Sequence, residues 1–115
     1  MMKLFENFGF NSKKKVVLLG YDLGGAIALS CGFHSKLMKA VSAIITLHPT
    51  WTDSIEKLAM INIPTLLFWF PLEDFHLISA GQKMSKAIKT SKLYRFNINP
   101  VEYNNVGCYY GQYAE

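Results

Sequence analysis

Cysteine is scarce in this 115-residue sequence, which contains only Cys31 and Cys108, 77 positions apart. That spacing matches neither a metal-binding nor a redox motif, so we expect reduced thiols and predict no metal site and no cofactor. Long apolar runs are also missing, because no segment approaches the ~20 apolar residues that a membrane-spanning helix needs. We therefore expect a soluble, cytoplasmic protein with no membrane partner.

Acidic residues are fewer than basic ones, eight against twelve, which gives a formal net charge of +4. Lysines cluster at residues 13–15 and recur at Lys83, Lys86 and Lys89. The cluster leads into an apolar segment and the later three have helical spacing, so both sets are expected to be solvated surfaces. Because no aromatic residues alternate with them, the sequence predicts no nucleic-acid partner.

Half of the residues are hydrophobic and 17% are charged, a composition typical of a globular domain. Apolar segments rich in β-branched residues alternate with segments of helical pattern. The expected strands are 16–21, 41–47, 65–70 and 92–98, and the expected helices are 24–33, 54–61 and 78–89. This order predicts an α/β fold with an open, mainly parallel sheet of about four strands and helices on both faces. We assign residues 1–98 to this domain and residues 99–115 to a C-terminal tail whose pattern indicates neither helix nor strand.

The junction between the first strand and the first helix is residues 20–25, Gly-Tyr-Asp-Leu-Gly-Gly. Glycines bracket the turn, so Asp22 is expected at its apex, at the carboxyl end of the strand, where open α/β sheets form their sites. One alternative is that Asp22 only caps the helix. A dinucleotide-binding loop is the other alternative, but the Asp22 carboxylate would then crowd and repel the pyrophosphate.

Further candidate residues follow the next two strands. His48 ends the second, and Glu73, Asp74 and His76 follow the third. Neighbouring strands lie ~4.8 Å apart, so His48, one strand from Asp22, is the closer of the two imidazoles. The alternative for each histidine is an ordinary hydrogen-bonded loop residue, and for the acids a solvated loop position.

These features together resemble the α/β-hydrolase family over roughly residues 5–98, which correspond to the carboxyl half of that fold. Residues 20–24 resemble the nucleophile elbow, and the added glycine at position 25 resembles the branches with an aspartate nucleophile, the haloalkane dehalogenases and epoxide hydrolases. The short gap 49–62 between the second and third strands instead resembles the capless, dienelactone-hydrolase-like branch, whose nucleophile is Ser or Cys.

The resemblance implies a hydrolase in which Asp22 is the nucleophile and the amide of Leu23 stabilises an oxyanion. Its partner would be a small-molecule substrate with an ester, carbon–halogen or epoxide bond. The family's second oxyanion donor comes from a loop after an earlier strand, which we expect to lie outside this chain.

The same resemblance implies an acid that orients a histidine base. Asp74, which we favour, or Glu73 would be the acid. The family places its histidine after the last strand, but no histidine follows His76 in this sequence. His48 or His76 would therefore have to act as the base.

The first strand, residues 16–21, raises a second possibility for function. No strand is expected before it, so it should form an apolar edge of the sheet, and such edges tend to pair with another strand. We expect pairing with a second chain, with the tail or with residues absent from this sequence. The alternative function is accordingly a non-catalytic interaction or structural module that forms a homodimer through this edge.

Overall fold

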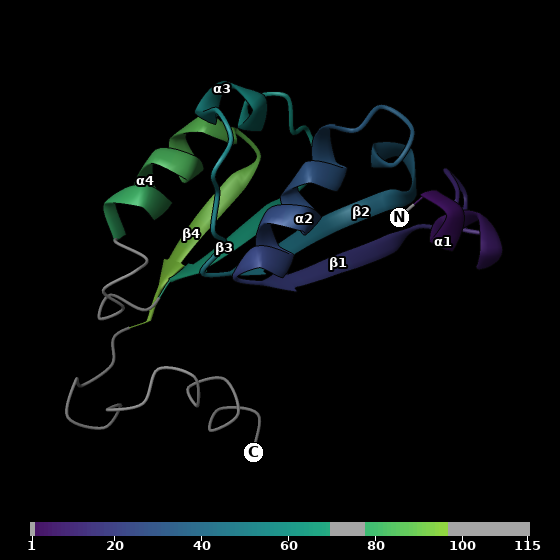
Figure 1. Ribbon diagram of the computed structural model, residues 1–115, viewed down its shortest axis with the longest axis horizontal. Helices are drawn as coiled ribbons and strands as arrows, with labels where there is room; N and C mark the ends of the chain where they lie inside the picture. Colours follow the sequence, from purple (N-terminus) through teal and green to yellow (C-terminus); the bar gives the residue numbers. More distant parts are fainter. Residues whose placement is uncertain (1, 70–77, 97–115) are drawn as a thin grey trace, which may run out of the picture.

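The fold is a single open sheet with helices, as seen in a computed structural model that describes residues 2–69 and 78–96 (Figure 1). Its strands are all parallel and have the order β1-β2-β3-β4. They are β1 (Val16–Tyr21), β2 (Val41–Leu47), β3 (Thr65–Trp69) and β4 (Ser91–Arg95). The helices are α1 (Met2–Asn7), α2 (Leu23–Phe33), the 3-10 helix η1 (Met38–Ala40), α3 (Ile55–Leu58) and α4 (Ile78–Ala87). The prediction of an α/β fold with a parallel four-stranded sheet is confirmed.

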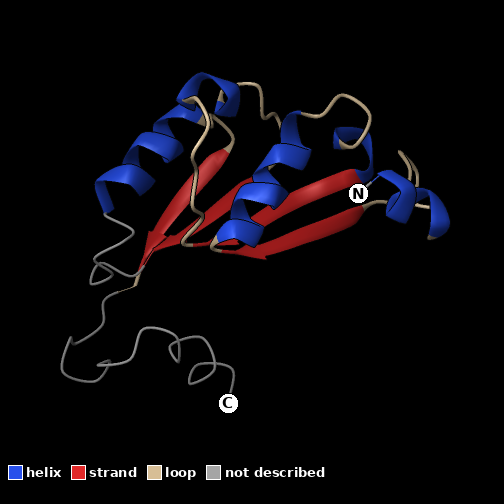
Figure 2. Cartoon of the chain, in the orientation of Figure 1, coloured by secondary structure: helices blue, strands red, loops and turns tan. Residues whose placement is uncertain are grey.

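The helices that pack on the sheet lie on one face of it (Figure 2). On the opposite face, within the described residues, β1 presents Val17 and Leu19, which are 55% and 69% exposed. This arrangement differs from the expected helices on both faces. An apolar run shows that both sides of a strand are hydrophobic, but it does not identify what covers each side.

The core lies between the sheet and the helix layer. Fully buried side chains come from several elements, among them Leu29 of α2, Ile44 of β2, Leu58 of α3 and Leu67 of β3. Burying each such side chain contributes about 1.5–3 kcal/mol. The helices α2 and α4 are therefore held on the sheet by apolar packing.

Close packing at the start of α2 explains two of the glycines. A Cβ atom at Gly20 would lie 2.2 Å from the carbonyl oxygen of Gly24, and one at Gly25 would lie 2.9 Å from Cβ of Pro49. A Cβ at Gly24 would meet nothing within 4 Å. The absence of a Cβ atom at Gly20 and Gly25 therefore allows β1, α2 and the segment after β2 to pack closely.

The α3 helix is shorter than the predicted helix over residues 54–61. Ser54 is its N-cap residue but makes no capping hydrogen bond with its side chain. Asp53 instead accepts a hydrogen bond from the Ser54 N–H (2.7 Å) and one from Lys57 Nζ (2.6 Å). The bond from Lys57 holds the pKa of Asp53 below its usual value. The Asp53 carboxylate therefore makes its hydrogen bonds to residues at the start of α3.

Candidate functional site

Asp22 lies at the apex of the turn between β1 and α2, with φ 55° and ψ −115°. A positive φ is uncommon for a residue with a side chain and costs of order 1–3 kcal/mol. The surrounding hydrogen bonds hold this conformation. The Asp22 N–H donates to the Leu47 carbonyl (3.0 Å), and the Asp22 carbonyl accepts from the N–H groups of Gly25 (3.1 Å) and Thr50 (3.0 Å).

The Asp22 carboxylate points toward the segment that follows β2. Its Oδ1 accepts a hydrogen bond from the hydroxyl of Thr50. Asp22 occupies the N-cap position of α2, but its side chain makes no capping hydrogen bond to the helix. Thr50 thus contacts Asp22 through both its backbone and its side chain. Thr50 is not among the site residues predicted from the sequence, although its position just after a strand end is a usable signal.

Leu23, the predicted oxyanion donor, is the first residue of α2 and its side chain is 66% exposed. The first N–H groups of a helix have no partner within the helix, and they carry its positive dipole end. The Leu23 amide therefore lies next to Asp22 at the N-terminus of α2, which is the helix end that favours negative charge.

His48 follows β2 directly, as predicted. Tyr21 of β1 is paired with Leu47 of β2, so Asp22 and His48 leave neighbouring strands at the same level. The His48 imidazole is fully buried and packs on Trp69, with ring centroids 5.2 Å apart. Its backbone has φ 46°, and its N–H donates to the Phe68 carbonyl (3.0 Å).

The other three predicted site residues, Glu73, Asp74 and His76, lie outside the described residues. Trp69, which ends β3, is the last described residue before them. The assignments of an acid and of a second imidazole therefore stay predictions from the sequence.

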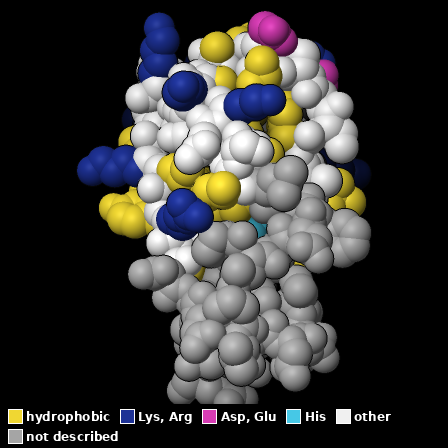
Figure 3. Space-filling view, turned by 90° about the vertical axis from the view of Figure 1, so that its left-hand side faces the viewer, with side chains coloured by type: hydrophobic (Ala, Val, Ile, Leu, Met, Phe, Trp, Pro, Cys, Tyr) yellow, Lys and Arg dark blue, Asp and Glu magenta, His cyan; other side chains and the backbone are white. Residues whose placement is uncertain are grey.

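A cavity of about 260 Å³ adjoins Thr50 on the helix side of the sheet. It is largely apolar, with one acidic and one basic residue, and is lined by Pro49, Thr50, Trp51, Asp53, Ile55, Trp69, Ala80, Lys83 and Met84. Figure 3 shows the side of the molecule that carries α4, where basic and hydrophobic side chains are interspersed. Because Thr50 contacts Asp22, this cavity adjoins a residue that is hydrogen-bonded to the candidate nucleophile.

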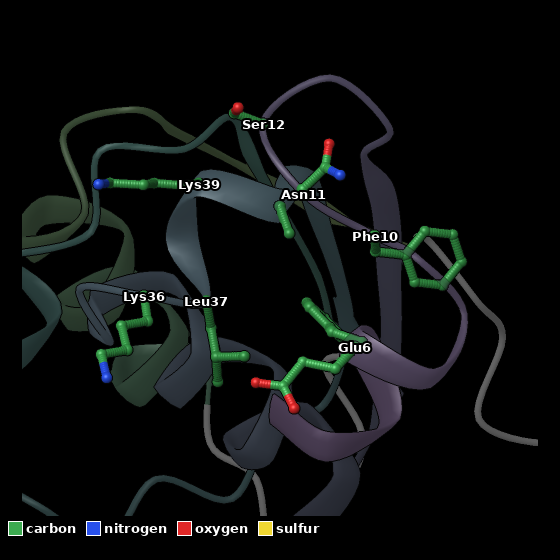
Figure 4. Close-up of a pocket in the computed structure, with 9 residues that line it drawn as sticks. Glu6, Phe10, Asn11, Ser12, Lys36, Leu37 and Lys39 are labelled. Atoms are coloured by element: carbon green, nitrogen blue, oxygen red, sulfur yellow. The ribbon is translucent and has the colours of Figure 1, made fainter.

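A second cavity, of about 310 Å³, lies near the amino ends of β1 and β2. Figure 4 shows the Glu6 carboxylate pointing toward Leu37, while the Phe10 ring and the amino groups of Lys36 and Lys39 point away. Its polar groups do not converge on a common point. It also lies at the opposite end of the strands from Asp22, so it is not part of the candidate site.

Neither a membrane-spanning helix nor a metal cluster is found in the part of the chain that the structure describes. No helix there is long and apolar enough to cross a bilayer. No group of three or more His, Cys, Asp or Glu side chains within residues 2–69 and 78–96 could hold a metal ion.

The strand order and the parallel sheet form a partial α/β-hydrolase-like core. Within that fold the chain belongs to the dienelactone hydrolase family, whose family model matches residues 2–102. No curated protein matches the chain.

Two solved structures share this fold. A predicted CIB-like hydrolase from Thermoplasma acidophilum superposes with a TM-score of 0.73 at 21% identity, covering 87% of this chain and 47% of its own. An α/β hydrolase enzyme from the metagenome of lagoon sediments at Mar Chica, Morocco, gives a TM-score of 0.71 at 15% identity, covering 98% and 67%. The chain thus spans about half of the first structure and two thirds of the second.

Proposed function

We propose that this chain carries the nucleophile of a hydrolase and that the nucleophile is the Asp22 carboxylate. The observation that carries the proposal is the Asp22 turn itself. The residue adopts a strained backbone conformation between strand and helix, next to helix amides that favour negative charge. Membership of the dienelactone hydrolase family supports hydrolytic chemistry at this position.

The carboxylate suits attack on a carbon that bears a leaving group. For a carbon–halogen bond, an Asp22 oxygen forms the new carbon–oxygen bond while the halide leaves. An epoxide opens in the same way, and its oxygen takes a proton from water. Water then attacks the carboxyl carbon of the Asp22 ester, gives a proton to a base and releases the alcohol. An ester substrate would instead transfer its acyl group to Asp22: the carboxylate forms a mixed anhydride, the alkoxide leaves and takes a proton from water, and a second water hydrolyses the anhydride to the two carboxylic acids. The Leu23 amide would stabilise the oxyanion in the steps at a carbonyl carbon.

The size and lining of the cavity beside Thr50 favour a compact, apolar substrate. Its volume of about 260 Å³ lies just below the range of roughly 300–1,000 Å³ common for ligand sites. The aromatic rings of Trp51 and Trp69 line it. A small halide, epoxide or ester with an apolar substituent would fit this lining.

The test is covalent labelling followed by release. We expect the chain to gain the mass of the alkyl group from a reactive alkyl halide or epoxide, at Asp22 by peptide mapping, and the Asp22→Asn variant to gain none. In ¹⁸O-labelled water, release of the adduct should place ¹⁸O in Asp22. A chain whose labelling is unchanged by Asp22→Asn would overturn the proposal.

His48 is the base that the same experiment tests. We expect His48→Gln to be labelled at the normal rate but to keep the adduct, because release requires an imidazole. A His48→Gln variant that is folded and releases the adduct normally would remove His48 from the mechanism. Thermal unfolding of both variants separates these outcomes from a loss of the fold.

A further inference from the structure

Trp69 adjoins both the proposed base and the cavity beside Thr50. It is the last residue of β3, and its side chain is fully buried. Its indole ring packs on the His48 imidazole, with ring centroids 5.2 Å apart and ring planes inclined by 46°. The same residue lines the cavity. One rigid, buried side chain therefore lies against the proposed base and borders the space proposed for the substrate.

Helix α4 packs on the same indole at Gly81. A Cβ atom at Gly81 would lie 2.8 Å from Cε3 of Trp69 and 2.9 Å from Cδ2, and its three nearest atoms would all belong to the indole. A glycine at this position therefore allows the helix to approach the ring closely. Because protein interiors are close-packed, the indole has little room to move between α4 and the His48 imidazole.

The orientation of the His48 ring decides whether it can serve as a base. A general base has to lie within hydrogen-bond reach of the proton that it removes, directly or through one water. The His48 N–H donates to the Phe68 carbonyl (3.0 Å), which fixes where the side chain begins. The last torsion of a histidine side chain is broad, so this backbone bond alone does not orient the ring. Contact with the indole restricts that torsion.

We propose that Trp69 is a positioning residue for His48, and that its indole sets the orientation in which the imidazole releases the covalent adduct. Gly81 of α4 keeps the indole in that place. This inference rests on the proposed function, because it concerns the release step assigned to His48. Since the indole also lines the cavity, the apolar group of the substrate lies against the same ring that orients the base.

The first test separates labelling of Asp22 from release of the adduct. The probe is iodoethane at saturating concentration, which gives the ethyl ester of Asp22 and iodide. We expect Trp69→Phe to be labelled within about twofold of the normal rate but to release the adduct at least about tenfold more slowly, because a small misplacement of a base is costly. Mass spectrometry of the peptide that contains Asp22 measures both rates.

Gly81→Ala tests the same link from α4 and leaves both rings in the chain. The added methyl group would collide with the indole and displace it, so release should slow by at least about threefold while labelling persists. Gln82→Ala is the matched control, because Gln82 is the next residue of α4 and is exposed. It should be labelled and should release the adduct as the unchanged chain does.

The imidazole signals of His48 give a readout that does not depend on activity. The chain contains three histidines, and the signal missing from His48→Gln identifies His48 in a ¹H–¹⁵N spectrum. We expect Trp69→Phe and Gly81→Ala to move that signal and Gln82→Ala to leave it in place. Thermal unfolding shows whether each variant is folded, and if Gly81→Ala is not, Trp69→Phe decides the result.

The outcomes distinguish this inference from the proposed function. Normal release by a folded Trp69→Phe, while His48→Gln keeps the adduct, would overturn the positioning role and leave the proposed function intact. Equal slowing of labelling and release would also overturn it, because a general structural defect has that effect. An unchanged chain that is not labelled at Asp22 would overturn the proposed function, and the role of Trp69 with it.

Discussion

At the scale of single residues, the contact between Thr50 and Asp22 distinguishes this turn from an ordinary strand–helix connection. The Thr50 hydroxyl donates to the Asp22 carboxylate, and the Thr50 N–H donates to the Asp22 carbonyl. The hydroxyl bond fixes the direction of the carboxylate. It also stabilises the negative charge that a nucleophilic carboxylate requires.

Replacing Thr50 with valine should therefore change the behaviour of Asp22 while leaving the fold intact. Valine keeps the shape of threonine but removes the donor, so the carboxylate loses a hydrogen bond worth about 1.5–3 kcal/mol to a charged group. We expect the rate of Asp22 labelling to fall by roughly tenfold, because the carboxylate is no longer held in one direction by the hydroxyl. The measurement is the labelling rate of the variant and of the unchanged chain at the same pH.

Thr50→Ser is the matched control, because serine restores the hydroxyl. It should return the labelling rate to that of the unchanged chain. A labelling rate that is the same for valine and serine would show that the hydroxyl does not act on Asp22.

Cys31 gives a second prediction at this scale. Burial raises the pKa of its thiol, so the folded state favours the neutral form. A raised pKa in the folded state contributes stability below the thiol's usual pKa, and this contribution is lost as the pH rises through the folded value. Cys31 should thus react with iodoacetamide at pH 8 at least about tenfold more slowly in the folded chain than in urea, since attack requires an exposed thiolate.

Mass spectrometry of the peptide that contains Cys31 measures the rate separately from that of Cys108. A Cys31 that reacts equally fast in folded and unfolded chain would contradict the burial. Above pH 9, the usual pKa of the thiol, the free energy of unfolding should also fall less in the Cys31→Ala variant than in the unchanged chain.

At the scale of elements, the junction of β1 and α2 depends on Gly20 more than on Gly24. A Cβ at Gly20 would contact the Gly24 backbone, which cannot move without separating helix from strand. We expect Gly20→Ala to lower the free energy of unfolding by about 1–3 kcal/mol or more, the usual cost of overpacking. Urea unfolding measures the change.

Gly24→Ala is the control within the same motif. Its Cβ would meet open space in a helix, where alanine is favoured over glycine by roughly 0.5–1 kcal/mol. It should therefore leave stability equal or higher. Equal destabilisation by both substitutions would contradict the packing described for this turn.

Much of this element structure could be predicted from the sequence, because local patterns encode it. The apolar run before Gly20 predicted β1, and Pro49 predicted the end of β2. Thr50 was missed because its contact with Asp22 joins residues 28 positions apart. The length of α3 was overestimated because the N–H groups of residues 59–61 each donate to the carbonyl three residues back, so the backbone tightens into turns and the α-helix ends at Leu58.

At the scale of the whole molecule, the described helix layer covers one face of the sheet and leaves the other open. Local periodicity could not predict this, because the sequence of β1 is apolar at positions directed to both faces. Which face a helix covers depends on the path of each connection, and that path is a property of the assembled chain.

The strand order β1-β2-β3-β4 follows the order of the chain, and each strand pairs with the one before it. Each pairing thus closes only the loop between consecutive strands, so its entropic cost is low. The sheet can grow in one direction as the polypeptide leaves the ribosome, with every new strand docking on the one just made. On such a route the Asp22 turn would be completed early, as soon as β2 and Thr50 have emerged.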